Sequence, residues 1–377
     1  MKRMFCIALA IILCVVFTAC GDPTPAEINQ NTIKVVLVCA GDAKDPQTQA
    51  AAYAAQLQNA AEMVELKDTQ YTVCDGVAAT NSALAEDAVR KYIKDGYSVV
   101  IATETGYAPA MKRLAAEYPR VTFVQVGAAD ETLPNYYAYR LKSYEGAYMC
   151  GLVAGCSTDK TTFGMIATSL ETAEAHQLAN AFLWGVQVTK PTATLLVVKK
   201  GEDYLSAVAT MKNNKCGGVL VTTDHPQTVT SLQEGNIPVY TVYGNCDMEA
   251  VTCRVVSYAR NQLGDTLQAL LTDGKPSYNN MSVGYADGFL SCDIGPAADV
   301  EGRTMTEAMK KIFLSGKWDV FSGTRLVWDM HVGDFAQSPV ACKDTEGTVR
   351  ILAGANTPVN ELLDEMFWWA EGIKIIQ

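Results

Sequence analysis

The sequence is poor in the residues and motifs on which many enzymes depend. Its 377 residues include only three histidines, His176, His225 and His331, which are scattered along the chain. The G-x-S-x-G, Walker A, G-x-G-x-x-G and H-E-x-x-H motifs are all absent. These absences favour a protein that is not an enzyme and needs no cofactor. A hydrolase with paired carboxylates in a cleft is kept as a remote alternative, because an acidic chain offers many carboxylates.

Positive charge is also in deficit. The chain has 30 lysines and arginines against 41 aspartates and glutamates, for a net charge of -11. Proteins that bind nucleic acid need a basic face that neutralises phosphates. The charge balance therefore argues against a nucleic-acid partner, although it leaves a small ligand at a local site fully possible.

Closely spaced cysteine pairs are missing too, although the chain has 12 cysteines. No pair has the C-x₂-C spacing of a zinc site, so no metal site is predicted. Cys6 and Cys14 belong to the apolar N-terminus and Cys20 directly follows it. Most of the remaining nine lie in apolar segments, where buried free thiols are the usual state. For Cys246 and Cys253, which lie in adjacent segments, a disulfide is the alternative.

Only the N-terminus has a long apolar run. Two basic residues precede the almost wholly apolar stretch 4–17, and small residues then precede Cys20. This pattern over residues 1–20 is typical of a signal peptide and resembles a bacterial lipobox, which predicts lipidation of Cys20 after cleavage. Phe17 is not the usual aliphatic residue, so an ordinary secretory signal is the alternative. Acyl chains would anchor the protein to a membrane, with residues 21–31 as a tether.

From residue 32 onward, short β-branched segments alternate with helical patterns. Asp45 before Pro46 predicts an N-cap and the first turn of a helix that runs to about Val64. Repeated strand–helix alternation is typical of a doubly wound parallel sheet. Strands are expected at 32–39, 71–74, 97–103, 121–126, 136–141, 163–167, 194–198, 218–222, 238–242 and 251–257. Further helices are expected at 82–94, 107–118, 173–188, 204–213, 258–272, 304–315 and 360–373.

Residues 142–164 combine a helix rich in small side chains with a turn and a new strand. Ala147, Gly151 and Gly155 fall on one face of this helix. Glycine inside a helix costs about 0.5–1 kcal/mol relative to alanine, which is tolerated where the helix must approach a sheet closely. A membrane helix is the alternative, but the apolar run is short and flanked by charged residues.

This stretch also carries a family resemblance. The motifs YEGAY at 144–148 and GLVAG at 151–155, followed by Gly164, resemble the signature of the basic membrane protein (Bmp) family. The similarity extends to NAFLWG at 180–185 and WWAEG at 368–372, and covers roughly residues 33–290. Bmp proteins are lipid-anchored substrate-binding proteins of ABC importers, related to purine nucleoside receptors.

The resemblance implies an α/β architecture of the type I periplasmic binding protein fold. Two doubly wound α/β lobes are then joined by three crossover segments. The N-terminal lobe is expected to contain 32–138 and 258–287. The C-terminal lobe is expected to contain 139–257 and 288–358, followed by a C-terminal helix at 359–377.

In doubly wound sheets, ligands bind outside the carboxyl ends of the strands. Polar and aromatic residues follow several expected strands, and the region 168–176 follows another. The candidate ligand-binding residues are Asp45, Thr48, Gln49, Glu104, Tyr107, Asp224, Tyr243 and Asn245. For Asp45, Asp224 and Glu104 the alternative is helix capping or turn formation.

The resemblance bears on which ligand is expected. Nucleoside-binding Bmp members usually have an aspartate, a stacking phenylalanine and an asparagine after the first strand. Asp45, Thr48 and Gln49 stand at these positions here, so the aspartate is retained and the phenylalanine is absent. Tyr243 stands where the family usually has an acidic residue on the ribose. These differences favour a free base or another heterocycle over a nucleoside.

The expected function is that of an extracytoplasmic, membrane-anchored substrate-binding protein. It would bind a purine base, a nucleoside-like compound or another small heterocycle in an interlobe cleft, and deliver it to an ABC permease. The alternative is a surface or sensory lipoprotein that retains the fold without transport.

Overall fold

The computed structural model describes residues 28–376, except 47, 128–131, 202, 223–224, 243–248, 250, 258–261 and 357–358. These residues form two compact units. The first contains 28–40, Ala61–Tyr139 and Thr266–Met281, and the second contains Gly41–Ala60, Arg140–Asp265 and the chain from Ser282. The chain changes unit after Ala40, Ala60, Tyr139, Asp265 and Met281. Gly41–Ala60, Gln262–Asp265 and 282–287, which are expected in the N-terminal lobe, therefore belong to the second unit.

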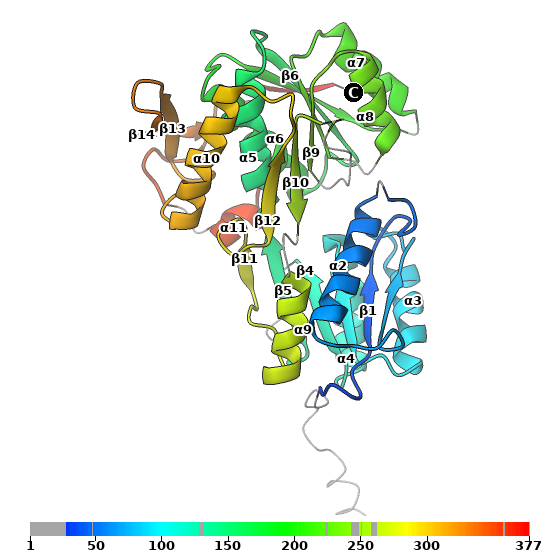
Figure 1. Ribbon diagram of the computed structural model, residues 1–377. Helices are drawn as coiled ribbons and strands as arrows, with labels where there is room; N and C mark the ends of the chain where they lie inside the picture. The colour runs from blue at the N-terminus through cyan, green and yellow to red at the C-terminus, as the bar shows by residue number, and fades with distance from the viewer. Residues whose placement is uncertain are drawn as a thin grey trace, which may run out of the picture. The chain divides into compact units, whose positions relative to one another are not determined.

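The first unit is built on a largely parallel sheet with the order β11-β5-β4-β3-β1-β2 in the described residues (Figure 1). Strand β1 is the fully buried sequence VVLV, and a strand buried on both faces is expected in a parallel sheet covered by helices. Strands β1 to β5 pair in parallel. Their bounds are β1 Val35–Val38, β2 Tyr71–Cys74, β3 Val99–Ala102, β4 Thr122–Val126, β5 Tyr136–Leu141 and β11 Met281–Val283. Helices α3 Ser82–Lys94 and α4 Ala108–Glu117 lie wholly in this unit. Helix α2 Gln49–Met63 belongs mostly to the second unit, and α9 Gln262–Asp273 begins in the second unit and continues in the first.

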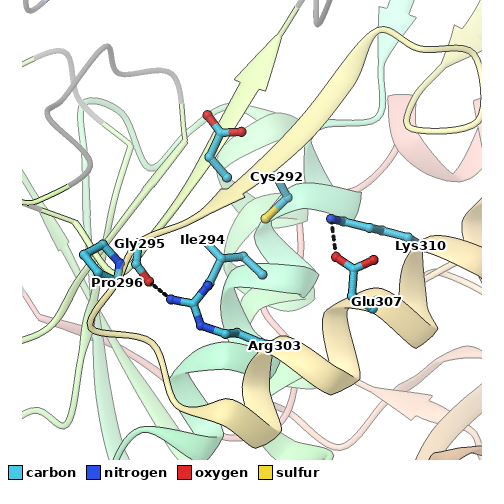
Figure 2. Close-up of a pocket in the computed structure, with 8 residues that line it drawn as sticks. Cys292, Ile294, Gly295, Pro296, Arg303, Glu307 and Lys310 are labelled. Carbon is cyan, nitrogen blue, oxygen red and sulfur yellow. Dashed lines mark hydrogen bonds and ion pairs between the residues drawn. The ribbon is translucent and has the colours of Figure 1, made fainter.

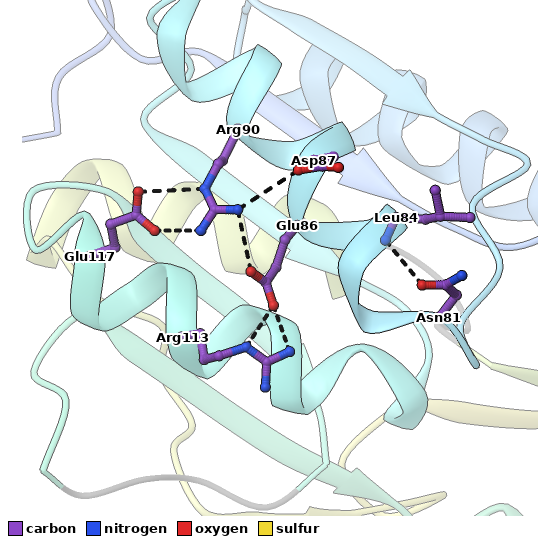
Figure 3. Close-up of polar contacts among 7 residues, drawn as sticks. All are labelled: Asn81, Leu84, Glu86, Asp87, Arg90, Arg113 and Glu117. Atoms are coloured by element: carbon purple, nitrogen blue, oxygen red, sulfur yellow. Dashed lines mark hydrogen bonds and ion pairs between the residues drawn. The ribbon is translucent and has the colours of Figure 1, made fainter.

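Helices α3 and α4 are joined on their exposed faces by ion pairs (Figure 3). Asn81 caps α3 by accepting a hydrogen bond from the Leu84 N–H at 3.2 Å. The Arg90 guanidinium lies 2.5 Å from the Glu117 carboxylate. Arg113 binds Glu86 in the same way, with 2.6 Å from Nε to Oε1. Charged side chains therefore link this helix pair at the surface.

The second unit has a larger sheet, with the order β12-β10-β9-β8-β6-β7-β17 in the described part of the chain. All its pairings are parallel except that of β10 with β12, which is antiparallel. The strands are β6 Thr162–Ala167, β7 Thr194–Lys199, β8 Val219–Val221, β9 Val239–Val242, β10 Cys253–Ser257, β12 Leu290–Ile294 and β17 Ile373–Ile376. The helices are α5 Ser143–Cys156, α6 Ala173–Gln187, α7 Tyr204–Asn213, α8 Pro226–Glu234, α10 Val300–Ser315 and α11 Val359–Asp364. A hairpin of β13 Thr324–Asp329 and β14 Asp334–Pro339 and a small pair, β15 Cys342–Lys343 with β16 Val349–Ile351, complete the unit.

Helix α5 confirms the expected small-residue helix and is buried almost throughout. A Cβ on Gly151 would collide with the Phe182 carbonyl of α6, and a Cβ on Gly185 would collide with the Tyr148 carbonyl of α5. At Gly146 the close neighbour is Val255 of the sheet. The glycines thus allow α5 to contact both α6 and the sheet. No helix in the described residues has the length and apolar character required to cross a membrane.

Three details differ from the sequence-based expectation. Helix α2 begins at Gln49 and not at Pro46, because Thr48 provides the cap: its Oγ1 accepts from the Ala51 N–H at 3.1 Å. The expected C-terminal helix is wrong after Asp364, where α11 ends, and Ile373–Ile376 forms β17 in parallel with β7. Strand β12 was not foreseen at all. Its antiparallel pairing with β10 arises from residues distant in sequence.

Candidate functional site

In the first unit, the carboxyl ends of β1, β3 and β4 are tied together around Glu104. The Thr103 hydroxyl lies 3.1 Å from the Val38 carbonyl and 3.2 Å from Glu104 Oε1. The Gln125 amide donates to the Glu104 carbonyl at 2.7 Å. A Cβ on Gly106 would lie 2.6 Å from the Ala79 carbonyl, so the loop after β3 is closely packed. Glu104, partly exposed, therefore projects from a loop with a fixed backbone.

Gln125, which the sequence analysis did not select, lies one residue before the end of β4. Its side chain is fully buried, and Nε2 also donates to the Val126 carbonyl at 2.5 Å. Its Oε1 has no hydrogen-bond partner among the described residues. A buried acceptor without a partner costs about 1–3 kcal/mol, so this oxygen marks a place where a donor from water or a ligand would be stabilising. A lone glutamine in the apolar strand TFVQV is the sequence signal that could have found it.

Tyr107 does not have the position expected of a ligand-stacking residue. Its ring is fully buried in the core of the first unit, and its hydroxyl donates to the Val77 carbonyl at 2.6 Å. Burial, followed by the nearby Glu104 carboxylate, raises the pKa of Tyr107 well above its ordinary value. The tyrosine is therefore a core residue, because the 3₁₀ turn Thr105–Tyr107 directs its ring inward.

The three candidates after β1 have different environments. Thr48 is buried, and its hydroxyl binds the carbonyls of Asp42 and Asp45 at 2.6 and 2.9 Å while it caps α2. Its hydrogen-bonding capacity is used within the protein, which makes it a structural residue. Asp45 is exposed and Gln49 is partly exposed. These two can reach a ligand, whereas Asp224, Tyr243 and Asn245 lie outside the described residues, as does Cys20.

In the second unit, rings gather where strands lead into helices. His225, directly before α8, has its ring 4.7 Å from that of Tyr204, the first residue of α7. His225 Nδ1 lies 3.0 Å from Thr228 Oγ1. Burial and the nearby Lys200 lower the pKa of His225, so the ring is neutral at pH 7. A neutral imidazole can both donate and accept a hydrogen bond.

A second ring group surrounds the start of α6, in the region expected to contribute to the site. The ring of His176 stacks on Trp369, with centroids 3.9 Å apart and an angle of 29° between the planes. Phe367 contacts the same imidazole edge to face at 6.1 Å and is 61% exposed. His176 Nδ1 lies 2.8 Å from the Thr172 carbonyl, which can only accept, so Nδ1 carries the proton. Burial lowers the pKa of His176 and keeps the imidazole neutral.

This geometry can be compared with known proteins. Residues 33–212 match the family model described as "ABC transporter substrate-binding protein PnrA-like", Bmp. The matched part is a little less than half of the chain. The sequence-based resemblance is thereby confirmed.

Two curated relatives share part of this sequence. The chain is 27% identical over 155 residues to the purine-binding protein of Brucella abortus. It is 28% identical over 136 residues to the putative ABC transporter glucose-binding protein of Haloferax volcanii. The alignments cover 40% and 36% of this chain but only 43% and 33% of the relatives. The chain therefore spans less than half the length of each of these relatives.

Solved structures confirm the fold of the periplasmic-binding-protein type. An ABC transporter solute-binding protein from Aeropyrum pernix has a TM-score of 0.61 at 12% identity, covering 80% of this chain and 95% of that chain. A transcriptional activator of the comK gene from Bacillus halodurans has a TM-score of 0.60 at 14% identity, covering 76% and 99%. Since one is a transcriptional activator and the other a solute-binding protein, this similarity concerns the fold alone.

Several Bmp motif residues have structural roles in the second unit. Asn180 is fully buried, donates to the Trp368 carbonyl at 3.1 Å and accepts from the Ala370 N–H at 2.8 Å. It therefore fixes the segment that carries Phe367 and Trp369. The guanidinium of Arg325 lies 3.4 Å from the ring centroid of Trp184, a cation–π contact. Distant Bmp motifs thus meet in space and support the ring group around His176.

Glu145 of the YEGAY motif is a buried carboxylate in the second unit. Its Oε2 accepts from the Tyr285 N–H at 2.8 Å and its Oε1 lies 3.6 Å from Lys142 Nζ. Burial raises the pKa of Glu145 to about 7, although Lys142 and the Tyr285 N–H act in the opposite direction. Lys142 also lies 3.4 Å from Asp319, so two carboxylates share one ammonium group.

Proposed function

We propose that this protein is an extracytoplasmic substrate-binding protein of an ABC importer whose ligand is a purine base or a similar planar heterocycle. The observation that carries the proposal is the ring group of His176, Phe367 and Trp369 at the start of α6. Exposed aromatic surface favours a flat ring, and stacking contributes about 0.5–1.5 kcal/mol beyond the burial of area. The name of the Brucella abortus relative, a purine-binding protein, supports the same ligand class.

Hydrogen-bonding groups that suit the same ligand class occur in each unit. Glu104, as an ionised carboxylate, accepts from a ring N–H or an amino group. The unpartnered Gln125 Oε1 has the same preference. Asp45 and Gln49, together with Asp224, Tyr243 and Asn245, are proposed as additional contacts. Purine bases carry several N–H donors at their edges, so an acceptor-rich surface suits them better than it suits an anion.

The proposed protein binds its ligand and releases it unchanged to a permease. Ligand extraction followed by mass spectrometry identifies the cargo, and thermal unfolding with added bases and nucleosides ranks the candidates. A ligand present at a hundred times its Kd adds about 2.7 kcal/mol of stability. Chemical conversion of a stabilising compound would contradict the proposal in favour of an enzyme. Failure of all heterocycles to stabilise the protein would favour a surface or sensory lipoprotein.

The proposed location is the outer side of the cell membrane, through lipid attached to Cys20. The Cys20→Ala variant is expected to lose labelling by palmitate and to be found in the soluble fraction or to remain unprocessed. Metabolic labelling of both proteins in the native host measures this directly. Equal labelling of wild type and variant would show that Cys20 is not the anchor.

A further inference from the structure

Three buried cysteines of the second unit bring their sulfur atoms together. Cys150 lies on α5, Cys253 on β10 and Cys292 on β12. The Sγ atoms of Cys253 and Cys292 are 3.1 Å apart, and those of Cys150 and Cys253 are 3.6 Å apart. All three sulfur atoms lie within 4.8 Å of one another. Cys150 and Cys253 are 103 residues apart in the sequence, and Cys253 and Cys292 are 39 residues apart, so the cluster cannot be recognised from sequence spacing.

The fold explains how the three thiols meet. In the antiparallel pair of β10 and β12, Cys253 lies opposite Ile294 and Cys292 lies opposite Val255. The two cysteines are therefore diagonal neighbours on one face of the sheet. Helix α5 crosses this face at close range because Gly146 rests against Val255. Cys150 follows Gly146 by four residues, one helical turn, and so faces the same place.

The sulfur spacing suits a shared metal ion. Zinc–sulfur bonds of about 2.3 Å place tetrahedral sulfur ligands roughly 3.8 Å apart, which lies within the range of this cluster. A disulfide would engage two of the sulfurs and leave the third unused, at S–S distances of about 2.05 Å. All eight cysteines in the described part of the chain are free thiols. Among the residues that the structure describes, no imidazole or carboxylate joins the three thiols, whose sulfur donors are soft.

An opening leads to one of the three thiols. A pocket of about 540 Å³ in the second unit is lined in part by Cys292, Glu307 and Lys310 (Figure 2). Cys292 is 6% exposed, whereas Cys150 and Cys253 are fully buried. The Lys310 ammonium lies 2.6 Å from Glu307 in the lining of the same pocket. The pocket thus offers an entry path to Cys292 and has a positive charge in its lining.

We propose that Cys150, Cys253 and Cys292 form a binding site for a soft, thiophilic metal ion of low coordination number, with Cu(I) as the best match. Thiolate ligands select Cu(I) over hard cations, and three donors leave zinc one ligand short of its usual four. Each copper–sulfur bond that replaces an S–H bond releases one proton, and no electron is transferred. The site is independent of the heterocycle ligand.

Anaerobic titration of the reduced full-length chain with Cu(I), in competition with a chromophoric Cu(I) chelator, tests this site. One ion per chain is expected to leave the chelator, and X-ray absorption is expected to show sulfur neighbours only. Cys150→Ser, Cys253→Ser and Cys292→Ser are each expected to weaken binding at least tenfold. The matched control is Cys216→Ser, which removes a buried thiol of the same unit that contacts Met211 at 3.7 Å.

A second measurement guards against variants that fail to fold. In the wild-type protein, bound Cu(I) is expected to protect Cys292, the accessible member, from alkylation, as peptide mass spectrometry would show. The proposal would be overturned if the chelator kept all the copper in the presence of folded, reduced wild-type protein. An equal loss of affinity in Cys216→Ser would overturn it as well. A Cys253–Cys292 disulfide that persists in the native protein would also overturn it and would indicate a purely structural pair.

Discussion

The helix pair α5–α6 of the second unit and the helix pair α3–α4 of the first differ in their contacts, although buried apolar residues of both pairs belong to hydrophobic cores. Gly151 and Gly185 let α5 and α6 touch through their backbones. Helices α3 and α4 are linked by Arg90 and Arg113 to carboxylates at the surface. A buried residue packed against backbone tolerates almost no increase in side-chain volume. Exposed ion pairs, by contrast, contribute little to stability. Most residues that identify the family belong to the first kind of packing.

The residues of the Bmp-like motifs and the residues that are candidates for ligand binding are therefore different sets. Asn180, Trp184 and Gly185 are buried and serve packing, so they report on the fold. The residues that can contact a ligand lie in loops and helix starts, among them Glu104, His225 and Phe367. A ligand assignment therefore has to be tested at those positions and not at the conspicuous motifs.

The largest effect is expected for Gly151→Val. The added side chain collides with the Phe182 carbonyl, and neither backbone can withdraw without moving a whole helix. We expect a loss of about 3 kcal/mol or more in stability, at or above the upper end of typical overpacking costs. Chemical denaturation measures the change. The control is Gly201→Ala, where the nearest atom to the added Cβ is the Asp203 backbone N at 4.0 Å, an ordinary contact, and a change within about 0.5 kcal/mol is expected. Equal effects would contradict the backbone-contact account.

The next effect concerns Glu145 and pH. Its pKa is raised from 4.5 to about 7 in the folded protein, so between these values the folded state binds a proton that the unfolded state has lost. The stability from this group is complete below about pH 4.5 and falls as pH rises to about 7. Relative to Glu145→Gln, the unfolding free energy of the wild type should fall by about 1.4 kcal/mol per pH unit across that window. Denaturation curves at several pH values that gave a constant difference would show that Glu145 stays ionised.

The smallest effect is expected for Arg90→Ala in the α3–α4 pair. Arg90 contacts Glu86, Asp87 and Glu117 at the surface, where water and salt screen the charges. We expect no measurable change in the thermal midpoint at physiological salt, and a small decrease only at low ionic strength. A clear drop at high salt would show that the pair is stabilised by packing and not by charge.

Most of the fold could be predicted from local sequence patterns. β-Branched runs located the parallel strands, and small residues at helical spacing located α5. Ile373–Ile376 was assigned to a helix because the residues before it are helix-compatible, and only pairing with the distant β7 makes it a strand. The Thr48 cap was missed because Asp45-Pro46 offers an equally good local signal.

The candidate site was less predictable than the fold. Tyr107 follows a strand, as a ligand residue should, but one turn of 3₁₀ helix rotates it into the core. Gln125 and the group of His176 with Trp369 depend on contacts between distant segments. The three thiols of the second unit illustrate the same limit, since only the strand register brings them together.

Titration calorimetry of the wild-type protein with adenine, guanine and hypoxanthine and with their nucleosides tests the central claim most directly. The account predicts that a free base binds, and binds more tightly than its nucleoside. Phe367→Ala or Tyr243→Ala should weaken this binding by about 1–3 kcal/mol through lost burial and stacking. Leu352→Ala, which removes an exposed side chain elsewhere in the second unit, should leave it unchanged. A nucleoside that bound tenfold more tightly than its base, with both ring variants unaffected, would contradict the account.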